Sequence, residues 1–226
     1  MRLLLISSSI VHGYGFFDHS ESAIRRLLGD ARLNVAFVPF AQKDLDGSTA
    51  RTRERLGRMG YDVTQVRGRE EIEAADAIFT GGGNTFRLLK TLYDLELIDV
   101  IRERVRDGIP YIGSSAGTNI ATPSIRTTND MPIVYPPTFD ALGFVDFQIN
   151  PHYLDPDPGS THQGETREKR INEFHEENVT PVVGLREGAM LEVHDDVVTL
   201  IGDKGARIFK RGEEPYELEP GSRITF

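Results

Sequence analysis

The chain of 226 residues is long enough for one large domain with a buried core, and no low-complexity linker divides it. Its formal net charge of −9 argues against a general affinity for nucleic acid or for anionic membranes. The chain contains no cysteine, which excludes disulfides, cysteine-based metal sites and a thiol nucleophile. We therefore predict a single domain over residues 1–226 that binds neither nucleic acid nor a membrane, and a cytoplasmic location.

Apolar runs of strand length alternate with helix-like runs through the first half of the chain. Strands are predicted at residues 2–7, 34–40, 61–66 and 76–83, and helices at residues 20–29, 49–59, 85–94 and 97–108. The first apolar run is too short for the core of a signal peptide or for a membrane span, so we interpret it as a buried strand. Apolar strands joined by helices predict a parallel sheet covered on both faces.

The second half of the chain has a different pattern. Residues 122–150 contain several prolines and few periodic runs, so they are expected to be largely loop with short strands. Helical spacing returns at residues 164–178, and the segments PVVGL, AMLEV, VVTLIG, ARIFK and SRITF then have the pattern of short strands with tight turns. These strands predict an antiparallel β extension of the same domain.

The segment YIGSSAGTN at residues 111–119 contains a G-x-S-x-G pattern, with Ser115 between Gly113 and Gly117. A β-prone run precedes it and a short helix is expected after it. In this context the small flanking residues let the chain turn sharply, and the turn exposes the serine as a candidate nucleophile.

A serine nucleophile requires a base within hydrogen-bond reach and a third group that orients the base. Of the six histidines, His152 is the best placed, because an apolar segment delivers it to a predicted strand end. Asp130 would give the chain order Ser, Asp, His, and Glu187 would give Ser, His, Glu. Both orders are compatible with one geometry, so the order leaves the acid open.

Acyl transfer also requires hydrogen-bond donors for the oxyanion. The run GGGNT at residues 81–85 supplies backbone N–H groups that can approach a substrate closely, with Gly82 or Gly83 as candidates and Ala116 as the second donor. A flexible turn or a phosphate cradle is the alternative for this run. It has neither the G-x-G-x-x-G spacing nor the lysine of a P-loop, which disfavours nucleotide binding.

Six segments in this order and spacing resemble peptidase E, the α-aspartyl dipeptidase family of serine peptidases: GGGNTF, GSSAGTN, TTNDMP, NPHY, GETREKRI and GLREG. The resemblance extends from the first predicted strand to the C-terminal strands. It implies a flavodoxin-like three-layer α/β fold, related to class I glutamine amidotransferases, and cleavage of dipeptides that begin with aspartate. Several co-linear motifs are more specific than one G-x-S-x-G pattern alone.

The resemblance also implies roles for individual residues. It assigns the nucleophile to Ser115, the base to His152 and the acid to Glu187, with Asp130 as the alternative acid. Glu187 is favoured because it follows a predicted core strand, which could hold it rigidly. Arg167 is implied as the cation that recognises the substrate carboxylate. The group that binds the substrate α-amine stays open between Glu187, Asn84 and backbone carbonyls.

The expected partner is therefore a small peptide, Asp-Xaa, with the protein as a monomer or homodimer. No cofactor is implied, and no metal is predicted, because His152, His162 and His175 lack a zinc-like spacing. Two alternatives are kept. The first is a cyanophycinase-like hydrolase of β-aspartyl peptides with the same nucleophile, and the second is a non-catalytic small-molecule-binding domain of the same fold.

Overall fold

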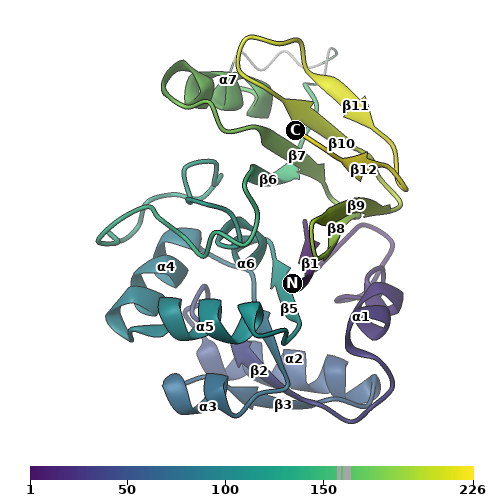
Figure 1. Ribbon diagram of the computed structural model, residues 1–226, viewed down its shortest axis with the longest axis vertical. Helices are drawn as coiled ribbons and strands as arrows, with labels where there is room; N and C mark the ends of the chain where they lie inside the picture. Colours follow the sequence, from purple (N-terminus) through teal and green to yellow (C-terminus); the bar gives the residue numbers. More distant parts are fainter. Residues whose placement is uncertain (157–158, 160–163) are drawn as a thin grey trace.

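An eight-stranded mixed sheet forms the centre of the larger part of the molecule (Figure 1). The computed structural model describes residues 1–156, 159 and 164–226. The strand order is β12-β9-β8-β1-β5-β4-β2-β3. Five neighbouring strands are parallel: β1 (Arg2–Ile6), β2 (Asn34–Val38), β3 (Asp62–Gln65), β4 (Ala77–Thr80) and β5 (Tyr111–Ser114).

Helices cover both faces of the parallel strands. Successive strand residues point to opposite faces, so Leu3 and Leu5 belong to one buried cluster and Leu4 and Ile6 to the other. The first cluster includes residues of α3 (Arg69–Glu73), α4 (Thr85–Asp94) and α5 (Leu97–Arg106). The second includes residues of α1 (Glu21–Leu28) and α2 (Leu45–Arg58). This arrangement confirms the predicted flavodoxin-like three-layer fold.

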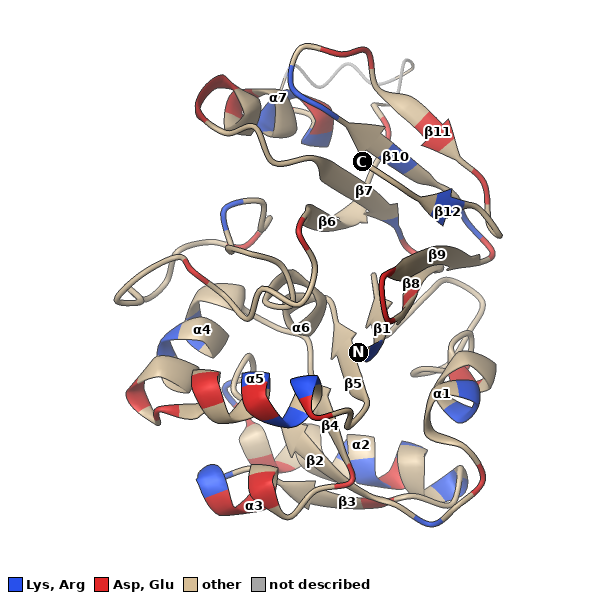
Figure 2. Cartoon of the chain, in the orientation of Figure 1, with Lys and Arg blue, Asp and Glu red and all other residues tan. Residues whose placement is uncertain are grey.

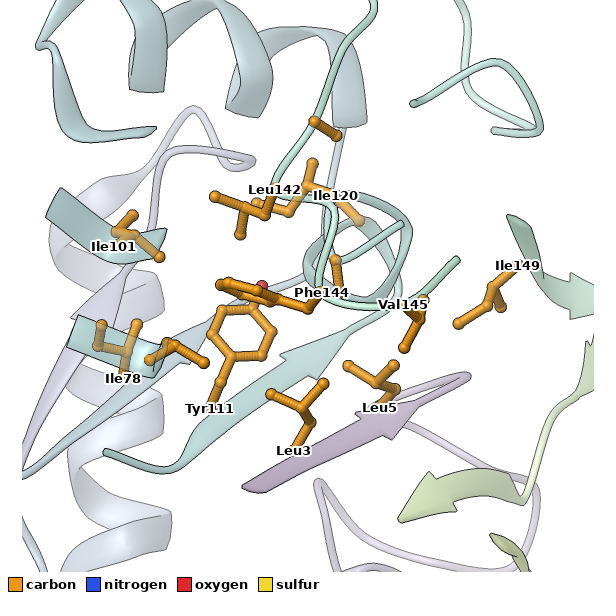
Figure 3. Packing of buried hydrophobic residues seen from close by; sticks show 14 of the residues in the cluster. Leu3, Leu5, Ile78, Ile101, Tyr111, Ile120, Leu142, Phe144, Val145 and Ile149 are labelled. Carbon is orange, nitrogen blue, oxygen red and sulfur yellow. The ribbon is translucent and has the colours of Figure 1, made fainter. Parts of the chain in front are cut away.

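The first cluster continues into the loop-rich segment that follows β5 and the short helix α6 (Ala116–Asn119). Figure 3 shows Tyr111 of β5 lying against Phe144 of this segment, with their ring centroids 5.2 Å apart. Residues 122–147 are largely loop, as expected, but the short strands also expected there do not form, and the segment has only an isolated bridge between Ser124 and Asp140. The apolar side chains of this segment nevertheless anchor it over the sheet.

The C-terminal strands are antiparallel as predicted, but they divide between two sheets. Three of them extend the main sheet beyond β1: β8 (Ala189–His194), β9 (Val197–Gly202) and β12 (Arg223–Ile224). A second sheet has the order β11-β10-β7-β6 and consists of β6 (Gln148–Tyr153), β7 (Val182–Arg186), β10 (Ala206–Phe209) and β11 (Tyr216–Leu218). Within it β6 and β7 are parallel. The helix α7 (Arg167–Glu177) packs on this sheet through Ile171.

One helix begins earlier than its apolar pattern indicates. The pattern predicts a start at residue 49, but α2 begins at Leu45 because the Asp44 side chain accepts a hydrogen bond from Gly47 N.

Charged residues of both signs occupy the helices, most visibly α3 and α5, while the strands of the parallel sheet are nearly free of them (Figure 2). None of the helices in the described part of the chain has the length and apolarity that a bilayer crossing requires.

Candidate active site

Ser115 lies at the sharp turn between β5 and α6. Its backbone has φ 52° and ψ −107°, a conformation that side-chain-bearing residues rarely adopt. Two hydrogen bonds hold the turn, since Ser115 N donates to Ile6 O at 3.0 Å and Ser115 O accepts from Asn119 N at 2.9 Å. The strained turn places Ser115 directly after the last residue of β5, at the carboxyl end of the parallel strand.

The two glycines of the motif allow this turn to pack closely. A Cβ atom at Gly117 would lie 2.1 Å from Thr80 O, and one at Gly113 would lie 2.5 Å from Gly117 O. Both partners are backbone atoms, which cannot rotate away as a side chain could. The G-x-S-x-G pattern is therefore a packing requirement as well as a chemical signature.

His152 lies within hydrogen-bond distance of Ser115, with 2.8 Å between its Nε2 and Ser115 Oγ. It lies on β6 at an irregularity in the β6–β7 register and has a positive φ of 55°. Its backbone N–H donates to Ser7 Oγ at 2.9 Å, and Ser7 Oγ donates to Leu185 O at 2.8 Å. The buried Ser7 hydroxyl thus ties His152 to β7.

Glu187 follows the last residue of β7 and contacts the other ring nitrogen of His152, with 2.6 Å between Oε1 and Nδ1. An ionised carboxylate only accepts hydrogen bonds, so Nδ1 carries the proton and Nε2 can accept the Ser115 hydroxyl proton. The preceding Arg186 binds Asp155 with one edge of its guanidinium (Nε and one terminal nitrogen) and Glu217 with the other (both terminal nitrogens). These ion pairs fix the strand end that carries Glu187.

Asp130, the alternative acid, has no hydrogen bond to His152 within the described residues. Its Oδ2 accepts hydrogen bonds from Thr85 N at 2.7 Å and from Thr85 Oγ1 at 2.6 Å, at the start of α4. Asn84 caps the same helix, because its side chain accepts from Arg87 N, and its Nδ2 donates to Met131 O. The hydrogen bonds of Asn84 to Met131 and of Thr85 to Asp130 thus hold the loop around Asp130 against the start of α4.

The backbone donors expected for an oxyanion lie beside Ser115. A Cβ atom at Gly82 would lie 3.1 Å from Ser115 Cβ, so the glycine permits a close approach. The N–H groups of Gly82, Gly83 and Ala116 have no hydrogen-bond partner in the part of the chain that the structure describes. Ala116 is the first residue of α6, so its N–H has no partner within that helix.

Two hollows open at Ser115 and His152. The larger, a cavity of about 290 Å³, is lined by the loop after β1, by α2 and by Gly81–Gly83, and includes Phe16, Gln42 and Arg51. The smaller, of about 20 Å³, is lined by Thr85, Asn119, Thr128, Asn129, Asp130 and Pro151. Different elements line the two hollows, and the serine and the histidine belong to both.

Arg167 begins α7 and is partly buried. Burial is the main cause that lowers the pKa of its guanidinium, the neighbouring Arg170 adds to this, and the carboxylate of Asp130 acts in the opposite direction. Arg167 has no hydrogen bond or ion pair with any residue that the structure describes. Its electrostatic interaction with Asp130 relates this cation to the loop that lines the smaller hollow, although Arg167 is not itself a lining residue of either hollow.

The model of peptidase family S51 matches residues 3–201. The chain belongs to this family. A protein of Streptomyces coelicolor named "Peptidase E" is 53% identical over 229 residues, and the match covers 100% of this chain and 94% of that protein. A Drosophila melanogaster protein named "Probable alpha-aspartyl dipeptidase" is 48% identical, with 100% of this chain and 96% of that protein covered.

A solved structure of a peptidase from an acI-B1 actinobacterium resembles this S51 peptidase with a TM-score of 0.72 at 19% sequence identity. The likeness covers 100% of this chain and 96% of that chain, and it shows a shared fold. The family match makes the chain a peptidase, so the expectation of a non-catalytic binding domain is set aside.

Several site residues of this S51 peptidase were given no role from the sequence, although Asn119 and Asn129 lie within the segments GSSAGTN and TTNDMP that carry the resemblance. Ser7 stands in a run of three serines, and Asn119 and Arg51 have the pattern of ordinary helix residues. Asn129, whose Nδ2 donates to Pro151 O at 2.7 Å beside His152, lies in a proline-rich loop.

His162, one of the histidines considered for metal binding, lies outside the described residues, and no cluster of potential metal ligands occurs among the described ones.

Proposed function

We propose that this S51 peptidase hydrolyses dipeptides that begin with aspartate, through an acyl-enzyme on Ser115. The observation that carries the proposal is the series of two hydrogen bonds that joins Ser115 Oγ to His152 and His152 to Glu187. The substrate class is supported by the names of the two relatives, "Peptidase E" and "Probable alpha-aspartyl dipeptidase", which match over the whole chain.

In the first step, His152 Nε2 takes the proton of the Ser115 hydroxyl as Oγ attacks the carbonyl carbon after the aspartyl residue. Glu187 accepts the Nδ1–H hydrogen bond and stabilises the imidazolium that forms. We assign the acid to Glu187 rather than to Asp130 because, of these two carboxylates, only Glu187 is hydrogen-bonded to the His152 ring, at 2.6 Å.

The tetrahedral intermediate carries a negative charge on the former carbonyl oxygen. The free N–H groups of Ala116 and of Gly82 or Gly83 are the donors for this oxyanion. His152 then gives its proton to the leaving amine, the C–N bond breaks, and an aspartyl ester of Ser115 remains. Water hydrolyses the ester with His152 as the base, which returns the free serine and releases aspartate.

Preference for aspartate requires a cation that is not already paired. Arg167 meets this requirement, since it is partly buried and has no ion-pair partner among the described residues. A guanidinium matches a carboxylate with paired donors, whereas an asparagine side chain would leave its charge uncompensated. We therefore assign recognition of the substrate side chain to Arg167.

The deciding experiment compares the hydrolysis of Asp-Leu and Asn-Leu at neutral pH without added metal. We expect cleavage of Asp-Leu alone, and loss of that cleavage in the Ser115→Ala protein. Equal cleavage by the Ser115→Ala protein would refute the serine mechanism. Cleavage of β-Asp-Leu in place of Asp-Leu would instead favour the cyanophycinase-like alternative.

A further inference from the structure

Two residues that line the smaller hollow beside Ser115 carry hydrogen-bond acceptors without a partner among the described residues. Asn119 lines it and is only 1% exposed. Its Nδ2 donates to Ile149 O at 2.9 Å, which fixes Oδ1 as the acceptor of the amide. Oδ1 is buried and has no partner within the described residues. A buried acceptor without a donor is rare in folded proteins, so this position calls for a donor from outside the chain.

Asp130 supplies the charge in the same hollow. Both hydrogen bonds from Thr85 go to its Oδ2, and in the described part of the chain Oδ1 accepts no hydrogen bond. The ion pairs found among the described residues do not include Asp130. The donors of Thr85 are thus already used, and the lining residues Asp130 and Asn119 each keep one oxygen that accepts no hydrogen bond from a described residue.

The size of the hollow suits a small cation. A volume of about 20 Å³ accommodates one group as large as a water molecule or an ammonium. The α-nitrogen of an N-terminal residue is separated by a single carbon from the carbonyl that Ser115 would attack. Its ammonium must therefore lie beside Ser115, which lines this hollow.

We propose that Asp130 and Asn119 bind the α-ammonium of the substrate, with one N–H donated to Asp130 Oδ1 and one to Asn119 Oδ1. The inference rests on the proposed function, because it names the recognition group of the same site. Asp130 lies close enough to Arg167 for their charges to interact. One aspartyl residue, which carries an ammonium and a carboxylate, complements this pair of opposite charges.

The test compares Asp-Leu with succinyl-leucine, which has the same skeleton but no α-ammonium. Binding is measured by calorimetry on the Ser115→Ala protein, so that no turnover is needed. We expect Asp-Leu to bind about 10- to 100-fold more tightly, the range of one or two charge-assisted hydrogen bonds. Asp130→Asn keeps the acceptor for Thr85 and should abolish this difference while the affinity for succinyl-leucine stays unchanged.

Asp99→Asn removes an equal charge from an exposed position on α5 and serves as the control that should change neither affinity. Equal binding of the two compounds by the Ser115→Ala protein would overturn the inference, as would an equal loss of both in Asp130→Asn. Either result leaves the proposed function intact if the parent protein hydrolyses Asp-Leu. Tight ammonium-dependent binding without hydrolysis would instead overturn the proposed function alone.

A second inference comes from the larger cavity and from the arginines of α2. Three of these arginines have polar partners: Arg53 donates to Val63 O, Arg55 pairs with Asp18 and Glu21, and Arg58 pairs with Glu54. Arg51 differs, because within the described residues it has neither a hydrogen bond nor an ion pair. Its guanidinium lies 4.6 Å from the centroid of the Phe16 ring, and both side chains line the cavity that contains Ser115.

We infer that Arg51 binds the C-terminal carboxylate of the dipeptide. With the α-ammonium in the smaller hollow, the leaving residue must occupy the larger cavity, where its carboxylate follows the scissile carbonyl by only three bonds. A cation held over an aromatic ring at this place favours substrates that end after the second residue. This inference also depends on the proposed function.

The test uses Asp-Leu and its amide, Asp-Leu-NH₂. We expect the parent protein to prefer the free acid in kcat/KM by about 10- to 100-fold, and Arg51→Gln to remove the preference by slowing only Asp-Leu. Arg58→Gln, an exposed arginine of the same helix, should leave both substrates unchanged.

Equal cleavage of acid and amide by the parent protein would refute the inference. If the parent cleaves neither compound, the proposed function has failed, and the affinities of the two compounds for the Ser115→Ala protein decide the role of Arg51.

Discussion

Replacing Gly117 by alanine tests how the turn at Ser115 is built. The added Cβ atom would lie 2.1 Å from Thr80 O and 2.8 Å from Thr80 C, whereas real Cβ atoms essentially never approach other atoms within 3.0 Å. β4 and α6 must therefore separate by about 1 Å, at an expected cost of about 3 kcal/mol in the free energy of unfolding. Because α6 begins directly after Ser115, the serine moves as well, and a displacement of about 1 Å lowers the rate about 100-fold.

Two assays test this expectation. Urea unfolding gives the change in stability, and hydrolysis of Asp-Leu gives the change in rate. Gly57→Ala is the matched control, since Gly57 lies in α2 with no atom within 4 Å of the added Cβ and should stabilise the protein by about 0.5–1 kcal/mol. If Gly117→Ala unfolds at the urea concentration of the parent and retains its activity, the steric reasoning is wrong.

Three further outcomes are expected. Ser7→Ala removes the acceptor of the His152 N–H, so kcat for Asp-Leu should fall about tenfold with little change in KM; a change confined to KM would contradict this. Glu187→Gln should lower kcat about 10²- to 10⁴-fold, because the amide no longer stabilises the imidazolium, and a rate equal to that of the parent would exclude Glu187 as the acid. Burial lowers the pKa of His19 below its ordinary value of about 6.5, against the opposing effect of Asp203. The unfolded chain therefore binds this proton first as the pH falls, and the free energy of unfolding should decrease as the pH falls through the ordinary value of about 6.5. Urea titrations should show a smaller decrease in His19→Gln, and identical slopes would refute the assignment.

The local sequence patterns determined much of the fold. Buried strands with apolar residues at every position, such as Leu3 to Ile6, predict a sheet covered on both faces, and the structure has the two clusters that this requires. The helices at residues 85–94 and 97–106 were predicted from periodicity within two residues of their bounds. The G-x-S-x-G pattern determined the turn at Ser115, because the glycines are needed where backbone approaches backbone. A single domain over residues 1–226 stays a prediction.

Pairings between distant segments were decided only by the tertiary structure. The division of the C-terminal strands between two sheets depends on which strand reaches the free edge of β1, and β8 does so although β7 precedes it in the chain. Short strands of similar composition carry no local signal for such a choice, since β propensity reflects packing against neighbours. Chain order left the acid open between Glu187 and Asp130 for a different reason, because one triad geometry occurs with several chain orders.

The polar contacts around Ser115 also could not be predicted from local sequence patterns. Ser7 and Asn119 are separated by 112 positions in the chain, but both form hydrogen bonds to the second sheet. Ser7 Oγ bonds to His152 N of β6 and to Leu185 O of β7, and Asn119 Nδ2 donates to Ile149 O of β6. A serine or an asparagine is ordinary in any segment, and its importance comes from the buried atoms that it contacts. The sequence by itself therefore determined the fold class and the turn that carries Ser115, whereas the folded chain brought Glu187 rather than Asp130 into hydrogen-bond contact with His152 and set the backbone supports and hollows around Ser115.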